Sequence, residues 1–179
     1  MKKVILVLAA LLLAVPSFAA MDARFMIGDG TSSKLLFDVT KEIKATVGLN
    51  YLELHGKVGS YSASGSAIMP SIGGEYSFNV TKNVEALVGI EYQHIFPTFK
   101  VEGNPMLDNV NSMVNDVLDK TVVNCISVYT GVNVKITPVL SLTGTTGIRL
   151  LNGSYSKDGV DLNLGMNSIY TQVGMLVSL

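Results

Sequence analysis

Two stretches of this sequence, FDVTKEIKATVGLNY at residues 37–51 and FNVTKNVEALVGIEY at residues 78–92, are identical at 8 of 15 positions. A third, weaker copy is VKITPVLSLTGTTGI at residues 134–148. In this copy Thr137 matches Thr40 and Thr81, and Pro138 stands where the other two have lysine. Proline and short polar residues suit a tight turn, and proline is unfavourable inside a strand ladder. Each copy therefore predicts a strand, a tight turn and a second strand.

The second half of each copy alternates between apolar and polar side chains. In the first copy Ile43, Val47 and Tyr51 share a face with Ala45 and Leu49. The opposite face carries Lys44, Thr46, Gly48 and Asn50. Residues 71–80, 84–93 and 122–136 show the same period of two. A period of two over about ten residues indicates a β-strand and not a helix.

Longer polar connections separate these turn units, at residues 28–33, 56–66, 97–120 and 152–161. With the three tight turns they divide the chain into eight expected strands. The expected spans are 21–28, 33–40, 43–55, 67–80, 84–96, 121–136, 139–151 and 162–179. The sequence thus predicts an all-β protein, an eight-stranded antiparallel transmembrane β-barrel with short turns at one end and long loops at the other.

Alternation alone fits two opposite barrels. A soluble lipocalin-type barrel, which would bind a small ligand in the periplasm, is apolar inside, whereas a membrane barrel is apolar outside. Charged residues are only 15% of this chain, against about 25% in an average domain. The polar face is rich in Gly, Ser, Thr and Asn, which fit a narrow interior, and Tyr51 and Tyr92 lie at one end of the apolar face. These features favour the membrane barrel, and the soluble one remains the alternative.

The first residues, MKKVILVLAALLLAVPSFAA, have the pattern of an export signal. Lys2 and Lys3 precede a short apolar stretch, and Ser17 and Ala19 are small residues at the −3 and −1 positions of a cleavage site. We expect a signal peptide at residues 1–19 and one outer-membrane β-barrel domain at residues 20–179. An uncleaved anchor is the alternative interpretation.

The signal, the eight alternating strands, the three tight turns and the four longer loops resemble the small outer-membrane barrels of the OmpA transmembrane-domain and OmpX type. The resemblance covers essentially all of residues 20–179, and it implies a location in the bacterial outer membrane. The last strand, YTQVGMLVSL, ends at Leu179 where the family usually has an aromatic residue.

The face expected to point inward carries five residues of each charge. They are Arg24, Lys34, Lys44, Lys135 and Arg149, and Asp22, Asp38, Glu75, Glu85 and Glu91. Because isolated buried charges are unfavourable, we expect these groups to pair and to plug the interior. The alternative is a narrow gated ion channel, or porin, in which Arg149 or Glu91 exchanges partners.

The sequence offers little for catalysis, cofactors or metal binding. His94 falls on the apolar phase past Tyr92, where we expect it at the outer rim, and His55 begins a loop. Cys125 falls on the inward phase as a buried thiol, and one cysteine excludes an intrachain disulfide. A formal net charge of −1 gives no basic field for nucleic acid. We expect a monomer that is not an enzyme, with no catalytic, cofactor-binding or metal-binding residues.

The loop at residues 97–120 switches from strand to helical periodicity. Asn104 suits a helix cap and Pro105 the first helical position. The expected apolar stripe is Met106, Val110, Met113, Val114, Val117 and Leu118. The expected polar face is Asp108, Asn111, Asn115, Asp116 and Asp119. The helix either lies on the barrel mouth with its stripe buried or displays it to the outer-membrane lipid, a surface ligand or a host factor.

Overall fold

The computed structural model describes residues 20–58, 61–102, 107–157 and 160–179. The predicted signal peptide, and the predicted cap and first helical residues Asn104, Pro105 and Met106, lie outside the described residues.

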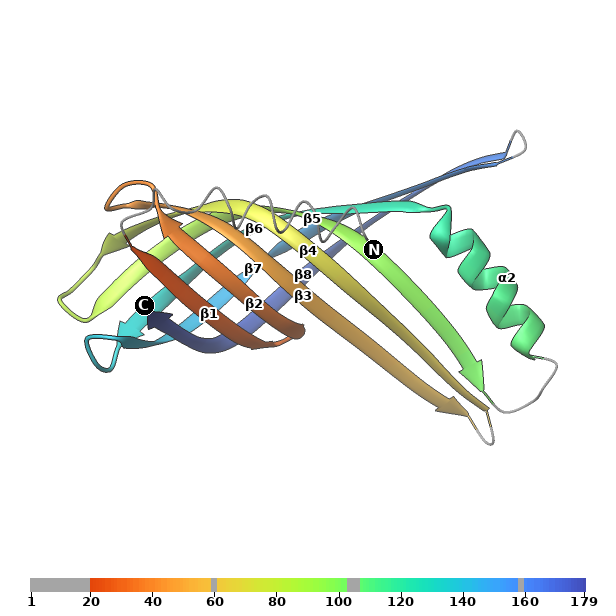
Figure 1. Ribbon diagram of the computed structural model, residues 1–179, viewed down its shortest axis with the longest axis horizontal. Helices are drawn as coiled ribbons and strands as arrows, with labels where there is room; N and C mark the ends of the chain where they lie inside the picture. The colour runs from red at the N-terminus through yellow and green to blue at the C-terminus, as the bar shows by residue number, and fades with distance from the viewer. Residues whose placement is uncertain (1–19, 59–60, 103–106, 158–159) are drawn as a thin grey trace.

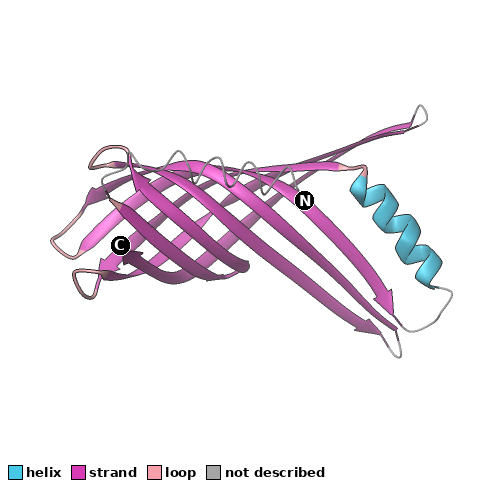
Figure 2. Cartoon of the chain, viewed as in Figure 1, coloured by secondary structure: helices cyan, strands magenta, loops and turns pink. Residues whose placement is uncertain are grey.

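Eight antiparallel strands form a closed ring in chain order, and β1 pairs with β8 to close it (Figures 1 and 2). The strands are β1 (Met21–Gly28), β2 (Gly30–Asp38), β3 (Ile43–Val58), β4 (Tyr61–Asn79), β5 (Val84–Glu102), β6 (Val122–Lys135), β7 (Leu140–Lys157) and β8 (Val160–Ser178). The helix α2 (Leu107–Asp119) connects β5 to β6. The predicted eight-stranded antiparallel barrel with a helix in the third long connection is confirmed. Across the described residues no helix has both the length and the apolar character needed to cross a membrane.

The repeated threonine organises all three tight turns, which lie at one end of the barrel (Figure 1). The hydroxyl of Thr40 accepts hydrogen bonds from the backbone N–H groups of Glu42 and Ile43, at 3.2 and 3.0 Å. Thr81 and Thr137 make the same two contacts in their own turns. A side-chain oxygen that accepts from backbone groups two and three residues ahead stabilises a tight turn. The sequence repeat is therefore a repeat of turn chemistry.

The connection between β1 and β2 is much shorter than predicted. Asp29 alone separates the two strands, whereas the sequence predicts a loop over residues 28–33. The connection is this tight because Gly30 has a φ of +93°, and a Cβ at that position would lie 2.4 Å from the carbonyl oxygen of Tyr51. As a result β1 and β2 stop about halfway along the molecule, and their neighbours continue without them (Figure 1).

The other long connections are also mostly strand. β3 and β4 continue to Val58 and Tyr61, β7 and β8 continue to Lys157 and Val160, and β5 continues to Glu102. The predicted loops at 56–66 and 152–161 are therefore wrong. Both contain serine and glycine, which are common in loops, but here these residues lie on paired strands with a continuous register. The extended hairpins leave the barrel at the end opposite the tight turns (Figure 1).

Within the barrel the predicted faces are confirmed. Ile72, Val88 and Ile148 are among the apolar side chains that are about half exposed on the outside of the ring. Inward-facing polar groups are buried, including Thr46 and Asn133. The interior also holds the apolar residues Met26, Leu36, Leu87 and Leu176. Small polar, charged and a few apolar side chains therefore fill the narrow interior together.

Candidate functional site

The outer wall is an apolar belt. Exposed outward side chains include Phe25, Leu49, Tyr76, Phe78, Val88, Tyr92, Ile126, Val128, Leu142, Ile148, Val173 and Met175. A closed barrel satisfies its backbone hydrogen bonds internally, so such a surface is stable only against hydrocarbon. This exterior rules out the soluble alternative, which requires a polar outside.

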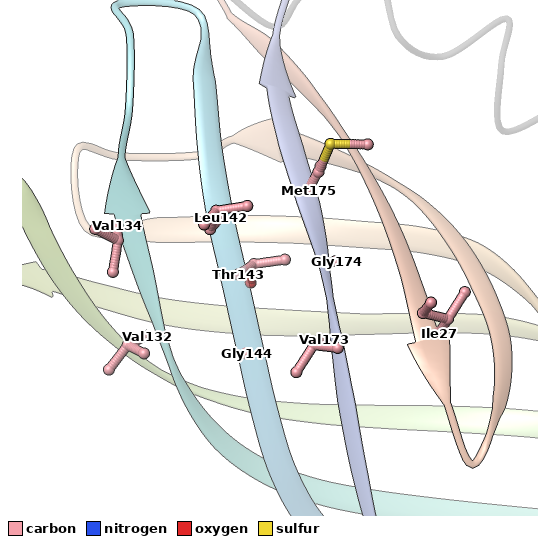
Figure 3. A pocket seen from close by; sticks show the side chains of 9 residues that line it. All are labelled: Ile27, Val132, Val134, Leu142, Thr143, Gly144, Val173, Gly174 and Met175. Atoms are coloured by element: carbon pink, nitrogen blue, oxygen red, sulfur yellow. The ribbon is translucent and has the colours of Figure 1, made fainter.

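A shallow groove interrupts the belt where β6, β7 and β8 lie together (Figure 3). Gly144 leaves it open, because a Cβ there would have no neighbour within 4 Å. The side chains around it are Ile27, Val132, Val134, Leu142, Val173 and Met175. The groove belongs to the lipid-facing surface, and the residues that line it are uncharged.

A buried ion pair lies at the centre of the barrel interior. Nη1 and Nη2 of Arg24 donate to the two carboxylate oxygens of Glu75, at 2.6 and 2.9 Å. The Tyr129 hydroxyl donates to the same carboxylate at 3.3 Å. Both charged side chains are almost completely inaccessible to solvent. Two parallel hydrogen bonds between a guanidinium and a carboxylate form a strong and geometrically specific contact.

A second buried pair joins Lys34 to Glu91. The Asn50 amide donates to the other oxygen of Glu91 at 3.3 Å. The Lys34 ammonium also lies 5.1 Å from the centre of the Tyr129 ring. Because Tyr129 contacts both pairs, it links them across the barrel. The predicted pairing of inward charges is confirmed for these four residues.

The remaining inward charges are partnered in different ways. Lys44 pairs with Asp22 at 2.5 Å and with Asp38 at 3.6 Å. Glu85 accepts hydrogen bonds from Ser77 and Asn133 at 2.8 and 2.7 Å. Lys135 is exposed at the end of β6, so its predicted place in the interior network is wrong. Lys135 is the last inward-facing residue of β6, and it lies at the end of the barrel.

Arg149 differs from the other buried cations. Its side chain is 8% exposed, and its Cζ lies 4.1 Å from the centre of the Tyr170 ring. Among the described residues it forms no ion pair with a carboxylate, and its Nε has no hydrogen-bond partner. The predicted self-neutralising pairing therefore fails at this residue, because an aromatic face stands where a carboxylate was expected.

Above Arg149 the polarity of the β7–β8 hairpin reverses. The register of the two strands is continuous from Leu140 to Lys157, so alternation carries each face unchanged into the extension. The side of the hairpin that faces inward in the barrel carries Leu151, Tyr155, Leu164 and Met166. The other side carries Asn152, Ser154, Ser156, Asn163 and Asn167. In the barrel the inward side is polar, and in the extension it is apolar.

The extensions of β3, β4 and β5 reverse in the same way. Their outward side carries Glu53, His55, Lys57, Ser62, Ser64, Ser66, Thr98, Lys100 and Glu102. Their inward side carries Leu52, Leu54, Ala63, Ala67, Met69, Ile95, Phe99 and Val101. On the polar side Lys100 hydrogen-bonds to Glu102 and lowers the pKa of that carboxyl below its ordinary value. The polar outer side indicates that these extensions stand in water beyond the membrane.

We call the apolar inward side of the two extensions the upper inner face; its residues are Leu52, Leu54, Ala67, Met69, Ile95, Phe99, Val101, Leu151, Leu164 and Met166. Its base is the packed cluster of Met69, Ile95 and Cys125, which Leu52 and Leu151 contact. On one side this face is not closed by strands. The β1–β2 hairpin ends where Gly28 pairs with Gln172, so β8 above this point has no neighbour from β1 in the described residues.

The helix α2 is attached to the free edge of β5. The pairing between β5 and β6 ends at Ile95 and Val123, so the β5 backbone beyond it has no β6 partner among the described residues. Asn111 and Asn115 hydrogen-bond to the backbone there. Two residues of the predicted polar face, Asn111 and Asn115, therefore contact a strand.

The apolar stripe of α2 is divided between two environments. Met113 is 70% exposed and Val117 is 40% exposed, whereas Val114 and Leu118 are half-buried. The stripe is therefore not buried as a whole on the barrel mouth, because the asparagines orient the helix and turn Met113 outward. The placement of Met106 and of the Val110 side chain lies outside the described residues.

The two histidines lie at the outer surface. Nδ1 of His94 lies 2.8 Å from Oδ1 of Asn124, and its ring packs edge-on against Phe96. His55 lies 3.1 Å from Glu53 on the polar side of β3. Cys125 is buried, as predicted. In the described part of the chain no three His, Cys, Asp or Glu side chains are placed to hold a metal ion.

Comparisons with known proteins find similar solved structures and no sequence match. No protein-family model matches the chain, and no curated protein matches its sequence. The crystal structure of Neisserial surface protein A is 14% identical, with a TM-score of 0.48, and the match covers 88% of this chain and 92% of that one. A major outer membrane protein from Thermus thermophilus is 12% identical, covering 89% and 98%, with a TM-score of 0.48. CarO from Acinetobacter baumannii is 11% identical, covering 89% and 97%, with a TM-score of 0.46.

Three properties of the chain's own geometry identify its class. Eight strands close into a ring, the outside of that ring is apolar, and its inside is filled by paired charges and polar groups. Only a barrel embedded in a bilayer combines these three properties. The chain is a small eight-stranded β-barrel of the bacterial outer membrane, resembling the OmpA transmembrane-domain and OmpX type.

Proposed function

We propose that this chain presents its extended hairpins at the cell surface to bind a ligand, and that its interior forms no open ion channel. The reversal of polarity above Leu150 and Ile169 carries the proposal. Extensions that only connected strands would not need an apolar inner face opposite a polar outer one. An ordered extension with an apolar inner side suits a binding role.

The closed interior supports the second half of the proposal. Eight-stranded barrels are narrow enough for side chains to fill them. Here Arg24, Glu75, Tyr129, Lys34 and Glu91 form connected contacts across the interior. Ions would have to break these buried pairs in order to pass.

The proposal includes export through a signal peptide cleaved after Ala19, and it includes no catalytic role. His94 is the histidine nearest the outer rim, and its ring nitrogen contacts the Asn124 amide oxygen rather than a carboxylate. In histidine-dependent hydrolysis the imidazole activates a nucleophile, and an amide oxygen is not a nucleophile of this kind.

Cysteine labelling on whole cells tests the surface role. Asn163→Cys places a thiol on the polar side of β8, and Lys41→Cys places one in the β2–β3 turn. A membrane-impermeant maleimide should label Asn163→Cys on intact cells and Lys41→Cys only after the outer membrane is broken. The native Cys125 is buried and should stay unlabelled. The opposite labelling pattern would overturn the proposed orientation and, with it, the surface role.

A further inference from the structure

We propose that the upper inner face binds a long-chain fatty acid and that Arg149 holds the carboxylate. This inference deepens the proposed function and rests on it, because it names the ligand class that the extended hairpins would take.

Both extensions carry exposed apolar side chains on their inward side. Leu54, Leu164 and Met166 are 65%, 73% and 59% exposed, although they lie on strands whose opposite side is polar. Contiguous exposed apolar surface on an otherwise water-facing element marks a binding surface. The β3–β5 extension and the β7–β8 hairpin both turn this side inward, above the same base of Met69, Ile95 and Cys125. Leu52 of one extension and Leu151 of the other pack on this base, and beyond it the two extensions diverge (Figure 1). An apolar chain that rises from the base along β7 and β8 would lie on Leu151, Leu164 and Met166.

A buried positive charge lies at the lower end of this apolar surface. Arg149 lies two residues below Leu151 on the same side of β7, and it pairs across the sheet with Ser168, two residues from Met166. It is therefore a charged residue directly below the upper inner face. It is more than nine-tenths buried, its Nε has no partner among the described residues, and no carboxylate there pairs with it. A buried guanidinium without an anion is unfavourable, so a ligand carboxylate would complete this site.

The chemistry of the surrounding residues selects a single carboxylate on an apolar chain. A guanidinium and a carboxylate match through two parallel hydrogen bonds. From Leu151 to Tyr155, and from Leu164 to Ser168, the inward positions of the hairpin carry no charge. A head group with several charges would lack partners along this path. Arg149 to Tyr155 is six residues, about 20 Å of strand, which matches an extended chain of about sixteen carbons.

The experiment measures binding of radiolabelled palmitate to the full barrel in nanodiscs of a zwitterionic lipid, with empty nanodiscs subtracted. We expect one saturable site, and unlabelled palmitate should compete at least tenfold better than methyl palmitate, which lacks the charge. Arg149→Gln should weaken binding about tenfold or more, because a hydrogen-bonded charge pair is lost. Arg149→Lys should recover only part of the binding lost in Arg149→Gln, because it keeps the positive charge but not the two parallel hydrogen bonds.

Two neighbouring residues on β8 provide a matched pair of wall variants. Leu164→Asp places a charge on the upper inner face and should weaken binding strongly. Asn163→Asp places the same charge on the polar side and should leave binding unchanged. Each variant must first show the heat-dependent gel migration of the folded barrel. If Arg149→Gln does not fold, the competition between palmitate and its methyl ester on the unaltered chain still tests the carboxylate contact.

Three results would overturn the inference: equal palmitate binding by loaded and empty nanodiscs, equal competition by the methyl ester, or co-purification of a phospholipid in the same stoichiometric site. If palmitate fails to bind while Asn163→Cys still labels on intact cells, the ligand class is wrong and the surface role stands. If Asn163→Cys labels only in broken cells, the proposed function fails as well.

Discussion

The side-chain amide of Asn115 pairs with the backbone of Phe99 as a neighbouring β-strand would. The Phe99 N–H donates to Asn115 Oδ1 at 3.0 Å, and Asn115 Nδ2 donates to the Phe99 carbonyl at 2.8 Å. One helical turn away, Asn111 makes the same two contacts with Val101, at 2.7 and 2.8 Å. Two amides on one side of α2 thus replace the missing β6 ladder. An exposed strand edge is a site for unwanted pairing, and here a helix covers it.

Replacing both asparagines should release α2 from β5. Asn111→Ala/Asn115→Ala removes the four hydrogen bonds that join α2 to β5, each contributing about 1 kcal/mol. We expect faster tryptic cleavage at Lys100 and Lys120, followed by mass spectrometry, and unchanged heat-dependent gel migration of the barrel. Asn109→Ala/Ser112→Ala, on exposed positions of the same helix, is the matched control. Equal cleavage of both double variants would show that the amides do not hold the helix.

Removing residues 104–119 should leave insertion intact. The ring of eight strands closes through β1 and β8 and does not include α2. We expect the shortened chain to be exported and to keep its heat-dependent gel shift. Outer-membrane fractionation and gel migration measure both properties. A chain that fails to insert would make α2 part of the fold instead of an attachment to it.

Breaking the central ion pair should destabilise the barrel strongly. Glu75→Gln leaves the buried Arg24 guanidinium without its anion, and such losses are about 3–5 kcal/mol. Urea unfolding in lipid vesicles, followed by gel shift, measures the free energy of unfolding. Glu42→Gln, in an exposed turn, should have almost no effect. We expect Arg24→Met/Glu75→Leu to be less destabilised than Glu75→Gln, and the reverse order would contradict the argument from the unpaired charge.

Two glycines should respond oppositely to the same added methyl group. A Cβ on Gly89 would lie 2.2 Å from the Tyr129 ring, which packs over it between the two ion pairs. Gly89→Ala must displace that ring, so we expect a loss of about 1–3 kcal/mol in unfolding free energy. Gly144→Ala adds its methyl to the open lipid-facing groove and should be nearly neutral. Equal changes in unfolding free energy for the two variants would mean that displacing the Tyr129 ring does not reduce stability.

Because side chains fill the interior, we expect the barrel to have very low ion conductance. In planar bilayers we expect no large steady current, and only small intermittent events. Arg149→Ala and Glu91→Ala should change those events, because each removes a charge from the upper part of the interior. Large open channels that ignore both substitutions would refute the closed interior and favour a porin.

Much of the barrel could be predicted because its ladder imposes a period of two. Once Ile43 and Val47 are taken as outward, the buried Thr46 and Asn50 follow, and Thr40, Thr81 and Thr137 locate the turns. The extensions could not be predicted in the same way. There the two faces exchange polarity. Ser64 and Ser154 lie on the outward face, which is expected to be apolar in a membrane barrel, so the sequence pattern suggests a loop at these positions.

The partners of α2 and Arg149 were inaccessible to sequence reasoning for a different reason. An asparagine on the polar face of a helix is expected to face water unless a free strand edge lies beside it. Here that edge exists only because β5 extends beyond its pairing with β6. Similarly, five cations and five anions suggest complete pairing, but only the fold decides that Arg149 meets Tyr170. One signal was available for the extensions: Leu52, Leu54, Leu151, Leu164 and Met166 continue the inward phase with apolar residues.

The exchange of polarity also fixes how deep the barrel sits in its bilayer. Tyr51 and Leu150 are the last apolar residues on their outward faces, and Glu53 and Asn152 follow directly on the same faces. Sinking by one residue pair would press a carboxylate into hydrocarbon, and rising by one would expose an aromatic ring to water. Where the surrounding bilayer has a different thickness, the lipid must thin or thicken at the barrel wall. The protein therefore dictates the local height of the membrane, and with it the distance at which its hairpins stand above the lipid head groups.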